Sequence, residues 1–183
     1  MPETPDPRVT DHVDHLDVQP WADGARTPES LRIEGDPEMG DARERVAYAA
    51  VTTDEISTVR MASLVVDPRC GAIVTFDGVV RDHDDGKGVI RLDYQAHPSA
   101  QAVIEEVAAQ IASRYADVLV AVAHRYGPLT VGESALVCAV AAPHRKLAFA
   151  ACDDLVDTVK KRLPIWKHQQ FTDGSDEWVG ALG

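Results

Sequence analysis

The sequence has only five lysines, three cysteines and no apolar run long enough to cross a bilayer, and each scarcity excludes a class of protein. A transmembrane helix needs about 20 consecutive apolar residues, so the lack of such a run argues against a membrane protein. The residues that follow Met1 lack the basic and apolar regions of a signal peptide. We therefore expect a cytoplasmic protein.

The three cysteines form no CxxC pair, and an odd number does not suit a disulfide framework. Cys138 lies in an apolar run and Cys152 on the apolar face of an expected helix, so we interpret both as buried small hydrophobes rather than nucleophiles. The chain contains neither GxGxxG nor GxxxxGK[ST], and His12 and His15 alone are too few for a metal site. We expect no metal and no cofactor.

The charge of the chain is acidic and unevenly distributed. Its formal net charge is −12, which argues against duplex nucleic acid as a partner because phosphate binding needs an extended basic surface. Residues 1–45 hold twelve acidic residues against five arginines and few large apolar side chains. Such a composition is typical of a flexible arm. The sequence therefore predicts an acidic arm at 1–45 and one folded domain at 46–183.

The folded part alternates between strand-like and helical patterns in mixed order, which predicts an α+β fold. In the strand expected at 89–95, we place Ile90, Leu92 and Tyr94 on one face. Pro164 ends the last helix, whose apolar stripe has helical spacing. We expect strands at 46–51, 72–80, 89–95, 118–124 and 134–142, and helices at 53–65, from 98 onward, and at 145–162.

Four of the five lysines lie between His144 and His168, where the sign of the local charge reverses. Charge alone leaves two interpretations open, an anion-binding site or a solvated basic helix face. On the helix, Lys160 falls at the edge of the apolar stripe, whereas Lys161 points away from it. Partial loss of hydration lowers the pKa of a lysine and suits it to proton transfer, so Lys160 is the better candidate for chemistry.

Three further residues are candidates for anion binding. His144 and Arg145 lie at the start of the same helix, where backbone N–H groups favour anions. The alternative there is a helix cap with Arg145 paired to Asp153 or Asp154. Arg81 ends a strand and opens the polar loop at 82–88.

Arg81 and six short segments of the folded part form a combined pattern. The segments are GAIVTF (71–76), LDY (92–94), HRYG (124–127), APHR (142–145), KKRLPIWKH (160–168) and DEWV (176–179). Taken together, they resemble the large, catalytic subunit of molybdopterin synthase, and the resemblance spans about residues 46–180.

The resemblance implies a fold, a reaction and two partners. The fold is an α/β hammerhead with antiparallel sheets and flanking helices. The reaction converts cyclic pyranopterin monophosphate to molybdopterin, with two sulfurs taken from the C-terminal Gly-Gly thiocarboxylate of a small ubiquitin-like carrier. The family forms a central homodimer with one carrier at each end, which makes a heterotetramer. The carrier is a separate chain, because the arm at 1–45 is too short to be one and lacks an internal Gly-Gly.

The resemblance also assigns roles to the basic residues. Lys160 and Lys167 match the family's catalytic lysines, and Arg81, His144 and Arg145 match the residues that bind the pterin and its phosphate. Which lysine donates and which accepts a proton stays open. Two alternatives are a non-catalytic, anion-binding scaffold protein and a phosphodiester hydrolase. Retention of all five basic residues speaks against the first, and the lack of a metal or nucleophile pattern against the second.

Overall fold

The structure is a computed structural model that describes residues 31, 33–35, 39–84 and 86–180. Most of the arm predicted at 1–45 lies outside these residues. Within the described part, nine strands and three helices follow one another in mixed order, which confirms the α+β class. The strands are β1 (Val46–Thr52), β2 (Ala72–Val79), β3 (His83–Asp84), β4 (Lys87–Ala96), β5 (Leu119–Arg125), β6 (Gly127–Thr130), β7 (Ser134–Ala142), β8 (Ile165–Phe171) and β9 (Asp176–Gly180). The helices are α1 (Thr58–Leu64), α2 (Ala100–Arg114) and α3 (Arg145–Arg162).

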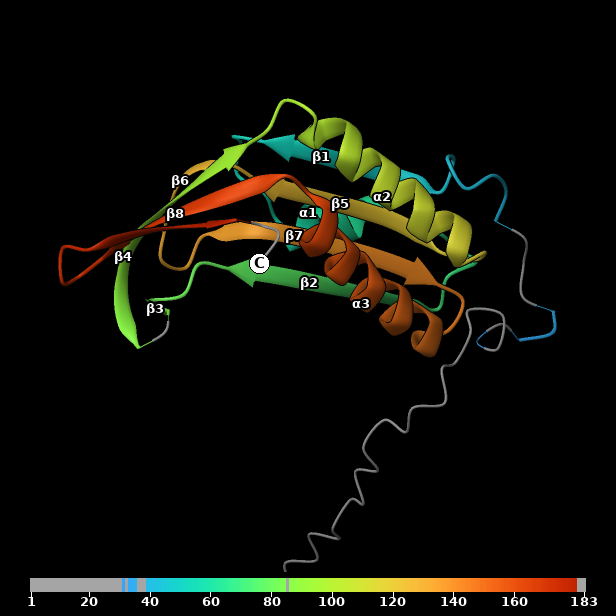
Figure 1. Cartoon of the computed structure of the whole chain (residues 1–183). Coiled ribbons are helices and arrows are strands. Elements are labelled where there is room, and N and C mark those ends of the chain that lie inside the picture. Colours follow the sequence, from blue (N-terminus) through green and yellow to red (C-terminus); the bar gives the residue numbers. More distant parts are fainter. Residues whose placement is uncertain (1–30, 32, 36–38, 85, 181–183) are drawn as a thin grey trace, which may run out of the picture.

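The first sheet has the strand order β1-β5-β7-β2 and helices on both faces. Strands β1 and β5 are parallel, and the other two pairs are antiparallel. Alternate residues of β5 and β7 face opposite sides: Val122 and Cys138 pack with α2 and α3, whereas Ala123 and Val137 pack with α1. Figure 1 shows α2 and α3 side by side along the sheet. The central strands are therefore buried on both faces.

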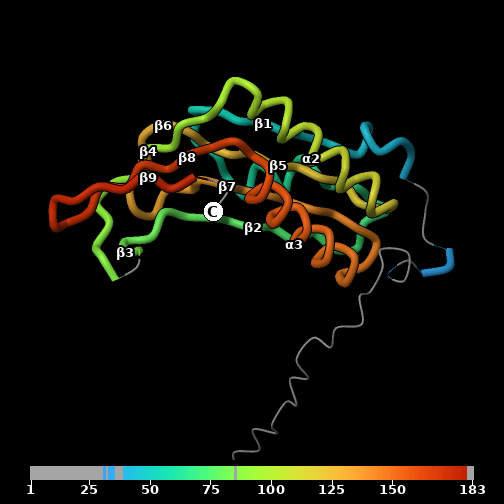
Figure 2. The backbone as a smooth tube through the Cα atoms, in the orientation of Figure 1, coloured from blue at the N-terminus to red at the C-terminus, as the bar shows by residue number. Residues whose placement is uncertain are grey.

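The second sheet is antiparallel and lies at one end of the molecule. Its strand order is β3-β4-β8-β9, and β6 also pairs with β4. Its own small core contains Leu92, Leu129 and Phe171. Figure 2 shows the chain passing from α3 directly into β8, so the last helix connects the two sheets.

The helix α3 has the bounds that the sequence predicts, Arg145–Arg162. At its C-terminus, the N–H of Leu163 donates a hydrogen bond to the carbonyl of Val159 (2.9 Å), directly before Pro164. The predicted apolar stripe is buried, and its members are Ala148, Cys152, Leu155, Val156 and Val159. The 3.6-residue period therefore placed this helix correctly.

The helix α1 begins later than the sequence predicts. We expected its start at Thr53, but the N-cap is Ser57. The hydroxyl of Thr52 accepts a hydrogen bond from the N–H of Asp54 (3.0 Å), which forms a local turn that competes with a helix. Ile56 is then buried beneath the first sheet before the helix starts.

The strand β4 contains an irregularity that breaks the predicted alternation. We expected Ile90 on the same face as Leu92 and Tyr94, but Ile90 is 56% exposed and Val89 is buried instead. The pairing with β8 shifts register between Val89 and Arg91, so one extra residue is inserted there. A bulge of this kind turns every earlier side chain to the opposite face.

Some residues of the predicted arm contact the folded body. Met39 is buried, and the guanidinium of Arg45 donates to the carbonyls of Tyr115 (3.0 Å) and Val118 (3.3 Å). Residues 1–30 lie outside the described residues, so the domain boundary at 45/46 stays a prediction. No helix within the described ranges is long and apolar enough to cross a membrane.

Candidate active site

Three of the five predicted site residues line one cavity of about 940 Å³. Arg81 follows β2, Lys160 lies in the last turn of α3, and Lys167 lies on β8. The cavity lies where the two sheets meet, because its walls come from β2 and β7 of the first sheet and from β4 and β8 of the second. Residues far apart in the sequence are thus brought to one concave, positively charged site.

Lys160 reaches the cavity from the C-terminal turn of α3. Its ammonium lies 5.6 Å from the centre of the Phe76 ring, within cation–π range. The side chain is exposed, so the desolvation that we expected from the edge of the apolar stripe is not observed. A cation in the last helical turn is stabilised by the helix dipole, and Lys161 and Arg162 share this location. The contact with Phe76 sets Lys160 apart from them.

Lys161 behaves as the predicted surface charge, although it reaches the rim of the cavity. Its side chain is 74% exposed and pairs with Asp157 one turn earlier (3.2 Å). An exposed pair of this kind contributes little to stability.

Lys167 points inward because of the alternation of β8. Ile165, Gln169 and Phe171 are buried on the same face, whereas Trp166 is exposed on the other. The ammonium of Lys167 donates to Oδ2 of Asp84 (2.8 Å), and its side chain is 27% exposed. The sequence analysis predicted no strand after Pro164 and so missed β8.

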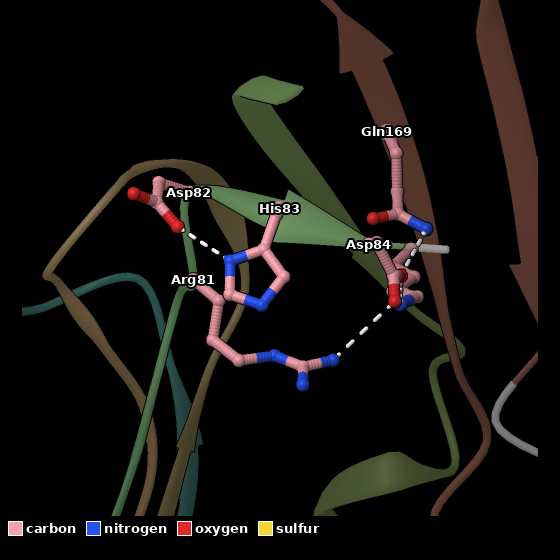
Figure 3. A network of polar contacts seen from close by, with 6 residues as sticks. Arg81, Asp82, His83, Asp84 and Gln169 are labelled. Carbon is pink, nitrogen blue, oxygen red and sulfur yellow. Dashed lines mark hydrogen bonds and ion pairs between the residues drawn. The ribbon is translucent and has the colours of Figure 1, made fainter. Parts of the chain in front are cut away.

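Asp84 was not predicted as a site residue, yet it contacts two that were. Its Oδ2 accepts hydrogen bonds from Lys167 and from Gln169 (2.8 Å each), and its Oδ1 accepts a longer one from Arg81 (3.3 Å). Figure 3 shows Asp84 between Gln169 and Arg81. The hydrogen bond from Lys167, then that from Gln169, holds the pKa of Asp84 below its usual value. The only signal in the sequence was its place three residues after Arg81.

His124 and Tyr94 form an apolar part of the cavity wall that the sequence analysis also missed. Their rings meet edge to face with centres 5.4 Å apart. Nδ1 of His124 donates to the carbonyl of Arg125 (2.9 Å), so Nε2 is the acceptor nitrogen of the neutral ring. Burial lowers the pKa of His124 to about 4. The site therefore contains an uncharged histidine beside Arg81, Lys160 and Lys167.

His144 and Arg145 do not line this cavity within one chain. They lie at the N-terminus of α3, and a rise of 1.5 Å per residue puts them about 22 Å along the helix from Lys160. The side chain of His144 makes no cap hydrogen bond, and Asp154 pairs with Arg114 rather than Arg145. Within one chain, the predicted site residues therefore form two separate groups, one at the cavity and one at the N-terminus of α3.

The cysteines are placed as predicted. Cys138 and Cys152 are buried, and burial raises the pKa of both thiols, that of Cys152 to about 11. Uncharged thiols of this kind are poor nucleophiles. Over the described ranges, no group of three or more His, Cys, Asp or Glu residues is arranged to hold a metal ion.

The sequence matches a family model and several named relatives. The family model described as MoaE protein matches residues 51–162, more than half of the chain. A molybdopterin synthase catalytic subunit from Nostoc sp. is 42% identical over 132 residues, which cover 71% of this chain and 80% of that protein. The subunit of the same name from Bacillus subtilis is 37% identical over 131 residues, covering 71% and 83%.

Comparison of the fold with solved structures also finds a molybdopterin synthase. The crystal structure of molybdopterin synthase from Staphylococcus aureus superposes with a TM-score of 0.67 at 29% identity. The match covers 73% of this chain and 97% of that chain.

Proposed function

The chain belongs to the MoaE family of molybdopterin synthase catalytic subunits, and on this basis we propose that it converts cyclic pyranopterin monophosphate to molybdopterin. The observation that carries the proposal is the meeting of Arg81, Lys160 and Lys167 in one cavity. Its volume of about 940 Å³ lies within the range of small-molecule sites, roughly 300–1,000 Å³.

The three cations suit the charge changes of this reaction. The cyclic phosphate diester of the substrate opens, and cationic donors stabilise the charge that develops on its oxygens. Arg81 can offer two parallel N–H donors to a phosphate, whereas each lysine offers a mobile point charge. Transfer of sulfur to the pterin side chain needs proton donors and acceptors, and we assign these roles to Lys160 and Lys167.

We assign the sulfur supply to a small ubiquitin-like carrier, which makes the enzyme a sulfurtransferase. The C-terminal Gly-Gly thiocarboxylate of the carrier would enter the cavity, because the sulfur must reach the substrate between the two lysines. Gly78 lines this cavity, and a Cβ added to it would come within 3.0 Å of the Phe76 ring, so glycine suits this part of the wall. Each transfer breaks the C–S bond of the thiocarboxylate, and a water molecule supplies the oxygen of the carboxylate that remains on the tail.

We place His144 and Arg145 in the site through a second copy of the chain. These residues lie about 22 Å from Lys160 along α3, so one chain cannot bring them to the cavity. A two-fold dimer would bring the N-terminus of α3 of one copy to the cavity of the other. Each site would then hold Arg81, Lys160 and Lys167 from one copy and His144 and Arg145 from its partner.

Reconstitution tests the proposal. Purified protein, a thiocarboxylated carrier and cyclic pyranopterin monophosphate are combined, and molybdopterin is measured. We expect stoichiometric conversion of the thiocarboxylate to carboxylate with two sulfurs per product. Failure to form molybdopterin with a carrier that is competent with a relative's catalytic subunit would contradict the proposal.

A further inference from the structure

The carboxylate of Asp84 occupies the place in this site where a bound anion would be expected. Two donors meet at its Oδ2, the ammonium of Lys167 and the amide of Gln169, each at 2.8 Å. Arg81 approaches the other oxygen at 3.3 Å. Two of the predicted cationic site residues, Arg81 and Lys167, are therefore engaged by a negative charge that belongs to the protein itself (Figure 3).

The contact is built by two strands and is not a chance meeting of surface side chains. Lys167 and Gln169 are two residues apart on β8, so both project from the same face. Gln169 is buried, with 2% exposure, and Asp84 is held on β3 by pairing with Lys87 on β4. The side chain of Asp84 is 24% exposed, which leaves it able to move toward solvent.

The donors differ in how firmly Asp84 holds them. The bond from Arg81 is long and the arginine side chain is 64% exposed, so its other N–H groups remain available to the cavity. Lys167 is held at 2.8 Å, and its ammonium has three N–H donors to share. A phosphate that binds both cations must come close to the Asp84 carboxylate, and two anions that share donors repel each other.

We propose that Asp84 acts as an internal competing anion, which engages Lys167 and Arg81 in the empty site and gives them up to the phosphate of the substrate. The inference rests on the function proposed above and adds a determinant of affinity to it. The lowered pKa of Asp84 keeps the carboxylate charged at neutral pH, so the exchange is one anion for another. Because Asp84 competes with bound phosphate, it weakens binding and favours release of a product that carries a more highly charged phosphate monoester.

The test measures binding of inorganic phosphate to the full chain by titration calorimetry. Asp84→Asn keeps the size and one oxygen acceptor of the side chain but removes its charge. We expect the Kd for phosphate to fall about tenfold, the effect of removing a like charge at close range. The matched control is Asp157→Asn, because Asp157 lines the same cavity but pairs with Lys161. It should change the Kd less than about threefold, as expected for an exposed, screened charge.

Three outcomes would overturn the inference. The Kd of Asp84→Asn could stay unchanged, it could rise because the cations lose their positions, or both variants could bind more tightly by the same factor. The last result would show a general effect of net charge. Arg81→Ala and Lys167→Ala separate this failure from a failure of the proposed site. If both weaken phosphate binding while Asp84→Asn has no effect, the anion site stands and the role of Asp84 does not.

Steady-state kinetics with the reconstituted system gives a second readout that a merely structural role would not produce. We expect Asp84→Asn to lower the KM for cyclic pyranopterin monophosphate and to lower kcat, since product release slows. Structural damage would instead raise KM. Unchanged KM in a variant that remains folded by circular dichroism would also count against the exchange.

Discussion

The ammonium of Lys160 lies over the ring of Phe76, 5.6 Å from its centre, and this contact joins the last turn of α3 to the strand β2. Lys160 is exposed, and within the described part of the chain no carboxylate pairs with it, so neither burial nor an ion pair singles it out. The face of an aromatic ring attracts a cation without neutralising it. The ring therefore directs the ammonium toward the cavity and leaves its charge available to a substrate.

Replacement of Phe76 tests this contact. Phe76→Leu removes the aromatic face, and we expect kcat to fall about threefold to fivefold, which corresponds to a cation–π contribution of roughly 0.5–1 kcal/mol at an exposed site. Phe76→Tyr keeps the face and should retain most of the activity. Equal losses in the two variants would show that packing, rather than the interaction with Lys160, is responsible.

Mixed dimers test the composite site. Lys160→Ala protein and Arg145→Ala protein should each be inactive, but one of the two sites in their heterodimer would contain both intact residues. After subunit exchange at equal concentrations, half of the dimers are mixed, so we expect about a quarter of wild-type activity to return. If both residues act within one chain, no activity will return, and sedimentation analysis will confirm that exchange occurred.

The half-buried His124 predicts a specific pH dependence of stability. Its pKa is lowered to about 4 in the folded protein, whereas the unfolded chain titrates near the ordinary value of about 6.5. The unfolded state therefore binds the proton first, and stability falls as the pH drops from about 6.5 to 4. Between pH 7 and pH 5, this group alone should lower the free energy of unfolding by about 2 kcal/mol.

Urea denaturation at the two pH values measures this effect. His124→Asn can retain the donor to the carbonyl of Arg125 but does not titrate, and Tyr94, the ring that packs against it, is left in place. The difference between pH 7 and pH 5 should shrink by about 2 kcal/mol in the variant. An undiminished difference would mean that other groups, chiefly carboxylates, account for the pH dependence.

Local sequence patterns predicted the structure correctly where it depends on a single helix or strand. The helical period and Pro164 predicted both ends of α3, and the same period separated Lys160 from the paired and exposed Lys161. The predicted start of α1 was wrong. The hydroxyl of Thr52 accepts a hydrogen bond from the N–H of Asp54, and this local turn replaces the first turn of the expected helix. The bulge at Ile90 had no signal, since it depends on the pairing with β8.

The candidate site could be predicted only in part, because some of its residues acquire their roles from contacts between different strands. Arg81, Lys160 and Lys167 were found from their charge and from the resemblance to a family, and the structure brings them together. Asp84 and His124 were missed because their roles arise from neighbours on other strands. A search for residues spaced two apart on β8 would have paired Lys167 with the buried Gln169.

The most direct test of the account compares two adjacent lysines in the reconstituted reaction. Lys160 lines the cavity above Phe76, whereas Lys161 pairs with Asp157 at the rim. Lys160→Ala should lower the rate of molybdopterin formation at least about 100-fold, the range expected for loss of a group that transfers protons in the reaction. Lys161→Ala should stay within about threefold of wild type, because exposed ion pairs contribute little. Equal rates for the two variants, both folded and both able to bind the carrier, would contradict the assignment of this cavity as the active site.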